Sequence, residues 1–246
     1  MTPDLSIVFP AYNEARRLPA SLEKAFEFIS STGRSAEVVV VDDGSSDDMV
    51  EVIRAQFGGR PDLRIVSYHP NRGKGWAVKT GVLESKGRLV LMSDADLSTP
   101  LTDLPVLERA MDAGADLVIG SRAVAGSQVV VAQKPLRQLG GKVFNRLLRT
   151  FLLKGLHDTQ CGFKLFNRQK VQPVFEQMTI ERFGFDIEML FLADRQGLKI
   201  AEVPVSWYNS EDTKVNFARD SSQMFIDIFR VRLNDMKGVY GPRGER

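Results

Sequence analysis

Residues 37–47 read EVVVVDDGSSD, an apolar run that stops abruptly at two aspartates. A short run that is rich in β-branched residues and apolar on both faces predicts a strand buried inside a parallel sheet. Four further runs have the same character: LSIVF at 5–9, LRIVS at 63–67, LVLM at 89–92 and DLVI at 116–119. The first half of the chain therefore predicts five buried strands.

Helical patterns separate these strands, at residues 17–30, 47–56, 75–85 and 103–113. Repeated strand–helix–strand units predict an α/β fold with a Rossmann-like, mostly parallel sheet and helices on both faces. The second half predicts a different order: a long helix at 136–153, strands near 162–166 and 200–205, and helices near 186–196 and 221–237. No linker divides the 246 residues, so we expect one domain over 1–246.

The composition narrows the class of protein. The net charge of +2 comes from 33 basic and 31 acidic residues, which gives no basis for a nucleic-acid partner. The single cysteine, Cys161, cannot form an internal disulfide and indicates a reducing cytoplasm. We find neither signal-peptide features in MTPDLSIVFP nor an apolar run of about 20 residues, as a membrane span needs. We expect a cytoplasmic protein, or one that contacts the cytoplasmic face of a membrane peripherally.

Polar segments follow four of the strands, at 10–14, 42–47, 94–98 and 120–122. Because ligands of open α/β sheets bind at the carboxyl ends of the strands, these segments predict one site. Asp94 and Asp96 are two residues apart after a strand and would point to the same side, where two carboxylates repel unless a cation lies between them. They predict a Mg²⁺ or Mn²⁺ site. Exposed or helix-capping aspartates are the alternative.

Other side chains of this edge suit a nucleotide. Tyr12 can stack on a base, while Glu14 and Asp43 can accept hydrogen bonds from a base or ribose. Lys74, flanked by glycines at a helix N-terminus, suits an anion, and Arg122 can bridge phosphate oxygens. Turn and capping roles are the alternatives, and we expect one of Ser45, Ser46 and Asp47 to cap the next helix. The chain has neither the Rossmann glycine fingerprint nor a P-loop at this point.

Together, several motifs resemble family 2 glycosyltransferases, which are inverting enzymes with the GT-A fold. They are PAYNE (10–14), VVVDDGSSD (39–47), NRGKGWAVKTG (71–81), DADLSTP (94–100) and GSR (120–122). Further along, DTQCGFKLF (158–166), GFDIEML (184–190) and VPVSW (203–207) resemble the dolichyl-phosphate β-glucosyltransferases of that family.

The resemblance implies a role for each matched residue. It implies that Asp94 and Asp96, with Ala95 beside them, bridge the metal and the diphosphate, and that Arg122 steadies the phosphates. Lys214 would meet the donor or a lipid phosphate. Related mannosyltransferases have glutamine at the position of Ser98, so the third metal ligand stays open. The residues implied to hold the nucleoside are Pro10, Ala11, Tyr12, Glu14, Val41 and Asp43.

The implied reaction transfers glucose from UDP-glucose to a polyprenyl phosphate such as dolichyl phosphate. Residues 1–125 would bind the nucleotide sugar, and residues 126–246 would bind the acceptor with amphipathic helices. A soluble hydroxyl acceptor is one alternative and would need a general base, for which Asp158, Asp186 and Glu188 are the candidates. A non-catalytic nucleotide-sugar-binding module is the other alternative.

Four further expectations concern the second half. Asp186 and Glu188 are expected to cap the helix that follows, while Cys161 and Phe163 are expected to pack inside the protein. Lys164 and Arg219 could bind an acceptor phosphate. The helices at 136–153 and 221–237 are amphipathic, and either pattern fits a helix in the lipid interface or one packed on the core.

Overall fold

The computed structural model describes residues 2–129, 155–208 and 217–241, with the backbone alone for residues 129 and 217–222. The helix predicted at 136–153 and Lys214 lie outside these residues, and so does the side chain of Arg219. In the described part of the chain, no helix is both long enough and apolar enough to span a bilayer.

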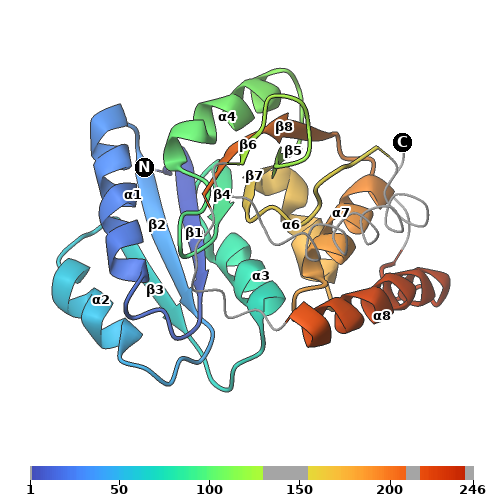
Figure 1. Cartoon of the computed structure of the whole chain (residues 1–246), viewed down its shortest axis with the longest axis horizontal. Coiled ribbons are helices and arrows are strands. Elements are labelled where there is room, and N and C mark those ends of the chain that lie inside the picture. The colour runs from blue at the N-terminus through green and yellow to red at the C-terminus, as the bar shows by residue number, and fades with distance from the viewer. Residues whose placement is uncertain (1, 130–154, 209–216, 242–246) are drawn as a thin grey trace.

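A seven-stranded sheet forms the centre of the molecule, with the strand order β3-β2-β1-β4-β7-β5-β8 (Figure 1). All neighbouring strands are parallel except β7, which runs antiparallel to both β4 and β5. The strands are β1 (Leu5–Ala11), β2 (Ala36–Asp42), β3 (Leu63–Ser67), β4 (Leu89–Ser93), β5 (Leu117–Ser121), β7 (Phe163–Asn167) and β8 (Ile200–Pro204). A separate pair is formed by β6 (Gln128–Val129) and β9 (Ser206–Trp207).

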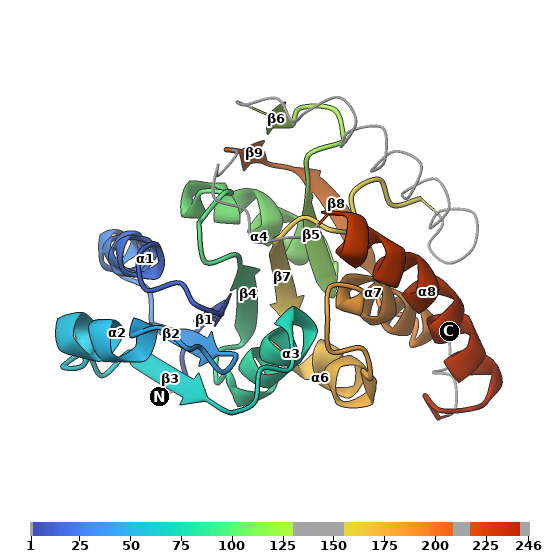
Figure 2. The same ribbon diagram turned by 60° about the horizontal axis from the view of Figure 1, so that its bottom comes forward.

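Helices cover both faces of the sheet, as predicted. On one face pack α1 (Leu18–Thr32), α2 (Met49–Phe57) and α4 (Leu104–Asp112), the last preceded by a 3₁₀ turn, Leu101–Asp103. The other face carries α3 (Lys74–Glu84), α6 (Arg168–Gln177) and α7 (Phe185–Arg195), and α8 (Phe217–Met236) lies outside α7 (Figure 2).

The strand sequences explain this two-sided burial. Successive side chains of a strand point to opposite faces. In β1, Ile7 and Phe9 therefore enter the core beneath α1, while Val8 enters the core beneath α3, and all three are fully buried. An apolar run without alternation is what a sheet covered on both faces requires.

The five strands of the first half are confirmed within one or two residues. The pairing of β7 was not predicted: it comes from the second half of the chain yet inserts between β4 and β5, so strands of both halves share one sheet. The prediction also missed α6, whose sequence RQKVQPVFEQ is polar and contains Pro173.

Candidate functional site

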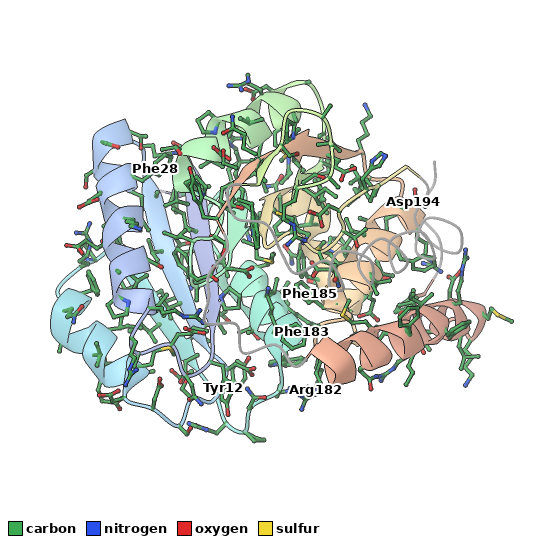
Figure 3. The ribbon with its side chains drawn as sticks, viewed as in Figure 1. Tyr12, Phe28, Arg182, Phe183, Phe185 and Asp194 are labelled. Carbon is green, nitrogen blue, oxygen red and sulfur yellow. The ribbon has the colours of Figure 1, made fainter. Side chains whose placement is uncertain are left out.

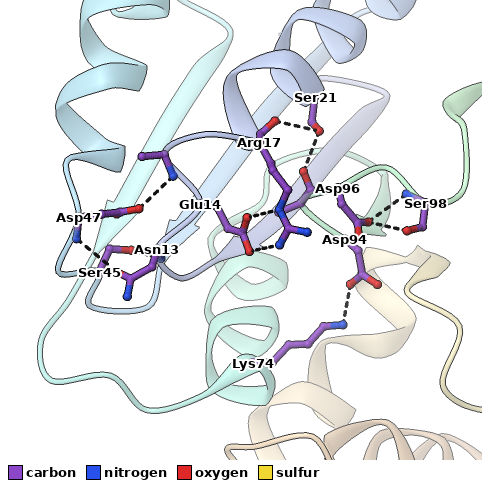
Figure 4. A network of polar contacts seen from close by, with 12 residues as sticks. Asn13, Glu14, Arg17, Ser21, Ser45, Asp47, Lys74, Asp94, Asp96 and Ser98 are labelled. Carbon is purple, nitrogen blue, oxygen red and sulfur yellow. Dashed lines mark hydrogen bonds and ion pairs between the residues drawn. The ribbon is translucent and has the colours of Figure 1, made fainter. Parts of the chain in front are cut away.

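The loops after β1 and β2 are joined by Asn13 (Figure 4). Its Oδ1 accepts hydrogen bonds from the backbone N–H groups of Ser46 (2.7 Å) and Asp47 (3.3 Å), and its own N–H donates to Ser45 Oγ (2.9 Å). Asn13 has a φ of 57°, a left-handed conformation that asparagine tolerates better than most residues. Of the three predicted capping residues, only Asp47 binds an N–H of α2, that of Met49 at 3.3 Å.

The predicted nucleoside residues of the first loop differ in exposure. Tyr12 is 42% exposed among the loops at the carboxyl end of the sheet, where a flat base could stack on it (Figure 3). Glu14 is largely buried, and its carboxylate takes two hydrogen bonds from Arg17, at 2.6 and 2.7 Å. Pro10 and Ala11 are buried at the end of β1. Val41 packs its side chain into the core, so its backbone is what a nucleoside could reach.

Asp43 organises the loop between β3 and α3. Its Oδ1 accepts from the backbone N–H groups of Arg72 (2.8 Å) and Gly73 (3.1 Å), and its Oδ2 accepts from Gly73 N (2.8 Å) and Asn71 Nδ2 (2.8 Å). The carboxylate is nearly buried, and its acceptor positions are occupied by this loop. Asp43 therefore shapes the loop that delivers Lys74, a role that its sequence position did not reveal.

The segment Asp94-Ala95-Asp96 lies in a turn, so the expectation of two extended residues is wrong. β4 ends at Ser93, and the N–H of Leu97 donates to Asp94 O at 3.0 Å, with a φ of 47° at Leu97. Asp96 Oδ1 accepts from both the N–H (3.0 Å) and the hydroxyl (2.8 Å) of Ser98. Ser21 of α1 holds the turn from the other side, since its hydroxyl donates to Ala95 O at 2.7 Å.

Lys74 reaches this turn from the first residue of α3. Its Nζ lies 2.5 Å from Asp94 Oδ1 (Figure 4). Burial favours the neutral amine, but Asp94, Asp186 and Asp96 outweigh that effect and raise the pKa of Lys74, which therefore stays charged. The structure thus brings together Asp94 and Asp96 of one predicted segment and Lys74 of another.

The donor set fits a hard divalent cation bound together with a diphosphate. Oδ2 of Asp94 and Oδ2 of Asp96 have no hydrogen-bond partner among the described residues, although each Oδ1 has one. Two carboxylates against one lysine leave the turn with excess negative charge. Nowhere in the described ranges do three His, Cys, Asp or Glu residues gather into a metal-binding group, so phosphate and water would have to supply the remaining ligands.

Arg122 follows β5 and is held by Asp158. The guanidinium donates to both carboxylate oxygens, from Nε at 2.7 Å and from Nη2 at 2.9 Å, and its backbone N–H donates to Asp158 Oδ2 at 2.9 Å. Burial opposes the charged form of Asp158, but the hydrogen bonds and charge of Arg122 prevail and lower the pKa of this carboxyl. A carboxylate with a lowered pKa is a poor general base.

The other two candidate bases, Asp186 and Glu188, also accept hydrogen bonds from groups within the protein. Asp186 is buried and accepts a hydrogen bond from Lys164 Nζ at 2.6 Å; burial raises its pKa, and the Lys164 ammonium offsets part of the rise. Glu188 is fully buried and accepts hydrogen bonds from Thr179, Ile180 and Tyr240. The prediction that these two acids cap their own helix is wrong, because neither caps α7. The suggestion that Lys164 binds an acceptor phosphate is also wrong, since its side chain is fully buried.

The turn before β7 lies directly against Asp94. Gly162 O accepts from the N–H of Asp94 at 3.1 Å, and a Cβ on Gly162 would overlap the Asp94 carboxylate. Lys164 Nζ donates to Cys161 O at 2.5 Å and so fixes the same turn. Cys161 and Phe163 are buried, as predicted. Gly162 lies within the motif DTQCGFKLF, but nothing in the local sequence indicates that it touches Asp94.

Comparison with known proteins places this geometry in a family. The model of the family described as "Glycosyl transferase family 2" matches residues 6–175. The dolichyl-phosphate beta-glucosyltransferase of Dictyostelium discoideum is 37% identical, over 96% of this chain and 76% of its own length. The human enzyme of the same name is 34% identical, over 97% of this chain and 78% of its own length.

Solved structures agree in fold. Glucosyl-3-phosphoglycerate synthase from Mycobacterium tuberculosis, in complex with Mn²⁺, uridine-diphosphate-glucose and phosphoglyceric acid, superposes with a TM-score of 0.70 at 22% identity. The match covers 93% of this chain and 79% of that one. The UDP complex of the same enzyme gives a TM-score of 0.69. The mostly parallel sheet, the acidic turn after β4 and the match over residues 6–175 together lead to one conclusion: this chain belongs to glycosyl transferase family 2.

Proposed function

We propose that this chain is an inverting glucosyltransferase that moves glucose from UDP-glucose to a polyprenyl phosphate. The observation that carries the proposal is the similarity, over nearly the whole chain, to relatives named dolichyl-phosphate beta-glucosyltransferase. The cluster of Asp94, Asp96 and Lys74 supports the donor side of the reaction, since it combines carboxylates for a metal with a cation for a diphosphate.

At the donor site, Asp94 and Asp96 would hold Mg²⁺ or Mn²⁺, which when bound neutralises charge on the departing diphosphate. Lys74 adds a positive charge at the N-terminus of α3, where the helix dipole also favours an anion. Arg122 keeps Nη1 for a phosphate oxygen, because its partner Asp158 takes only Nε and Nη2 among the described residues. Lys214 is proposed to meet a phosphate as well.

For the nucleoside, we propose stacking on the exposed ring of Tyr12 and contacts with the backbone of Pro10, Ala11 and Val41. Glu14 would contribute to nucleoside binding while its carboxylate stays paired with Arg17. Asp43 would contribute indirectly, by holding the loop that carries Lys74. Residues 1–125 would then form the nucleotide-sugar half, and residues 126–246 the acceptor half.

The three candidate bases are already bound to donors within the protein, which favours a phosphate acceptor over a hydroxyl acceptor. A hydroxyl must lose its proton to a base, whereas a phosphate oxygen is already anionic. Asp158 is bound to Arg122, Asp186 to Lys164, and Glu188 to four donor groups of Thr179, Ile180 and Tyr240. With these acids engaged, catalysis would consist of positioning and charge stabilisation. A lipid acceptor in turn implies contact with a membrane, and we propose that the enzyme makes this contact peripherally, from the cytoplasmic face.

The test is transfer from radiolabelled UDP-glucose to a polyprenyl phosphate in detergent, with Mg²⁺ or Mn²⁺. We expect label in the organic phase, loss of that label with Asp96→Ala, and full transfer with the control Asp112→Ala, whose carboxylate is exposed at the end of α4. Free glucose without glycolipid would point to a soluble acceptor. Wild-type transfer by Asp96→Ala would refute the metal site.

A further inference from the structure

Helix α8 has two apolar faces, and only one of them packs on the part of the chain that the structure describes. Met224, Ile228 and Val231 are buried against α7 and the neighbouring core. Four other apolar side chains recur every three or four residues, so they form a continuous stripe on the helix. This outward stripe consists of Ile226 (58% exposed), Phe229 (67%), Leu233 (47%) and Met236 (83%).

Basic and acidic side chains of α8 lie on different faces of the helix. Every exposed charged side chain between residues 223 and 237 is basic: Arg230 and Lys237 lie one turn after Ile226 and Leu233, and Arg232 lies one turn from Phe229 and Met236. The two acids of this part of α8 face inward. Asp227 is 1% exposed, and Asp235 pairs with Arg195 at 2.7 Å. The outward stripe is therefore apolar with cationic flanks.

Single exposed apolar residues are common on proteins, but a contiguous stripe marks a binding surface. A helix with an apolar face and basic flanks suits the boundary between anionic headgroups and acyl chains. We propose that the outward stripe of α8 binds the surface of a bilayer that contains anionic lipid, with Phe229 and Leu233 inserted and Arg230, Arg232 and Lys237 at the headgroups.

The packing of α8 connects this surface to the site. Asp227 fills the space beside Gly184, where a Cβ would overlap its carboxylate. Gly184 begins the turn into α7, two residues before Asp186, whose charge acts on Lys74. Arg232 also lies over the ring of Phe191 in α7, at 5.5 Å from the ring centre, and Figure 2 shows the two helices side by side. The membrane-facing helix is thus packed on the helix that carries a neighbour of the donor site.

This inference deepens the proposed function, since a lipid acceptor requires the enzyme at a bilayer. The test is flotation of the full chain with vesicles of phosphatidylcholine, with and without phosphatidylglycerol. We expect wild type to float with the anionic vesicles. The double variant Phe229→Ser/Leu233→Ser should bind about tenfold more weakly or worse, because two large apolar side chains no longer leave water. Both positions are exposed, so the variant should fold.

Two charge-reversal variants test the electrostatic part of the proposal. Arg230→Glu should weaken binding to anionic vesicles, while Arg54→Glu, the same change at an exposed position of α2, should leave it unchanged. Failure of wild type to float, unchanged flotation of the double variant, or dimerisation through the same residues without vesicle binding would each overturn the proposal. Transfer to polyprenyl phosphate in detergent, measured in parallel, separates this outcome from failure of the proposed function.

Discussion

Gly162→Ala should disable the donor site while leaving the fold largely intact. The added Cβ would meet the carboxylate of Asp94 and lie 2.6 Å even from Oδ1, the more distant of its two oxygens. Nonbonded heavy atoms need about 3.5 Å. The Asp94 carboxylate or the Gly162 backbone must therefore move by at least about 1 Å, because the other carboxylate oxygen lies closer still.

The carboxylate should be the part that moves. Gly162 is flanked by Cys161 and Phe163, which are both buried, and its turn is held by Lys164. The side chain of Asp94, in contrast, is 36% exposed and can rotate toward solvent. Its rotation would break the contact with Lys74. A misplacement of about 1 Å at a reacting centre lowers the rate by about 100-fold, whereas overpacking that an exposed side chain can relieve should lower the unfolding free energy by only about 1 kcal/mol.

Three measurements on the purified variant check this reasoning: glucose transfer at saturating substrate, Mn²⁺ binding by electron paramagnetic resonance, and urea unfolding. The matched control is Gly59→Ala, because a Cβ at Gly59 has no atom within 4 Å and the backbone there is not left-handed. Near wild-type transfer and Mn²⁺ affinity in Gly162→Ala would refute the role of this contact. A loss of transfer explained wholly by unfolding would refute it as well.

Three more variants or reagents test the groups around the site. Lys164→Met should lower the unfolding free energy by about 3–5 kcal/mol, because it leaves Asp186 buried without its cation. Urea titrations should show that the double variant Lys164→Met/Asp186→Leu recovers part of this loss. A loss below about 1 kcal/mol in Lys164→Met would contradict the pairing. Glu188→Gln should lower stability by about 1–3 kcal/mol through lost backbone hydrogen bonds but keep kcat per folded molecule, so a fall in kcat would revive Glu188 as a base. Cys161, whose pKa burial raises to about 11, should hold only about one thiolate in a thousand at pH 8 and react with iodoacetamide only in denaturant; rapid labelling of the native protein would argue against its burial.

Strand positions and the location of the site could be predicted because each leaves a local signal. Buried parallel strands are apolar on both faces, and the polar residues that follow them must meet at one edge of the sheet. This reasoning located Asp94, while the glycine-flanked start of a helix separately indicated Lys74 as an anion-binding residue, and the structure joins the two side chains at 2.5 Å. The residue types of Cys161 and Phe163 also predicted correctly that both side chains pack inside the protein.

The partners of each polar group could not be predicted in the same way, because they depend on contacts between distant segments. Asp43 looked like a ligand for ribose, yet residues 71–73 fold back onto its carboxylate. Lys164 and Asp186 looked available from the sequence, but β7 inserts between β4 and β5 and buries them against each other. Helix α6 was missed because its polar sequence and Pro173 give a weak helical pattern.

Carboxylates near the site differ in whether the protein itself supplies their hydrogen-bond donors, and this difference indicates which reaction the site supports. Asp43, Asp158, Asp186 and Glu188 all point at fixed donors, and their charges are therefore compensated within the protein. In the turn after β4, Lys74 pairs with Asp94 and Ser98 donates to Asp96, and each of these aspartates keeps an oxygen without a partner among the described residues. A compensated carboxylate stabilises loops, whereas an uncompensated pair attracts a cation. The same scaffold that removes candidate bases thus concentrates negative charge at one turn, which favours a metal-bound diphosphate and an acceptor that arrives already deprotonated.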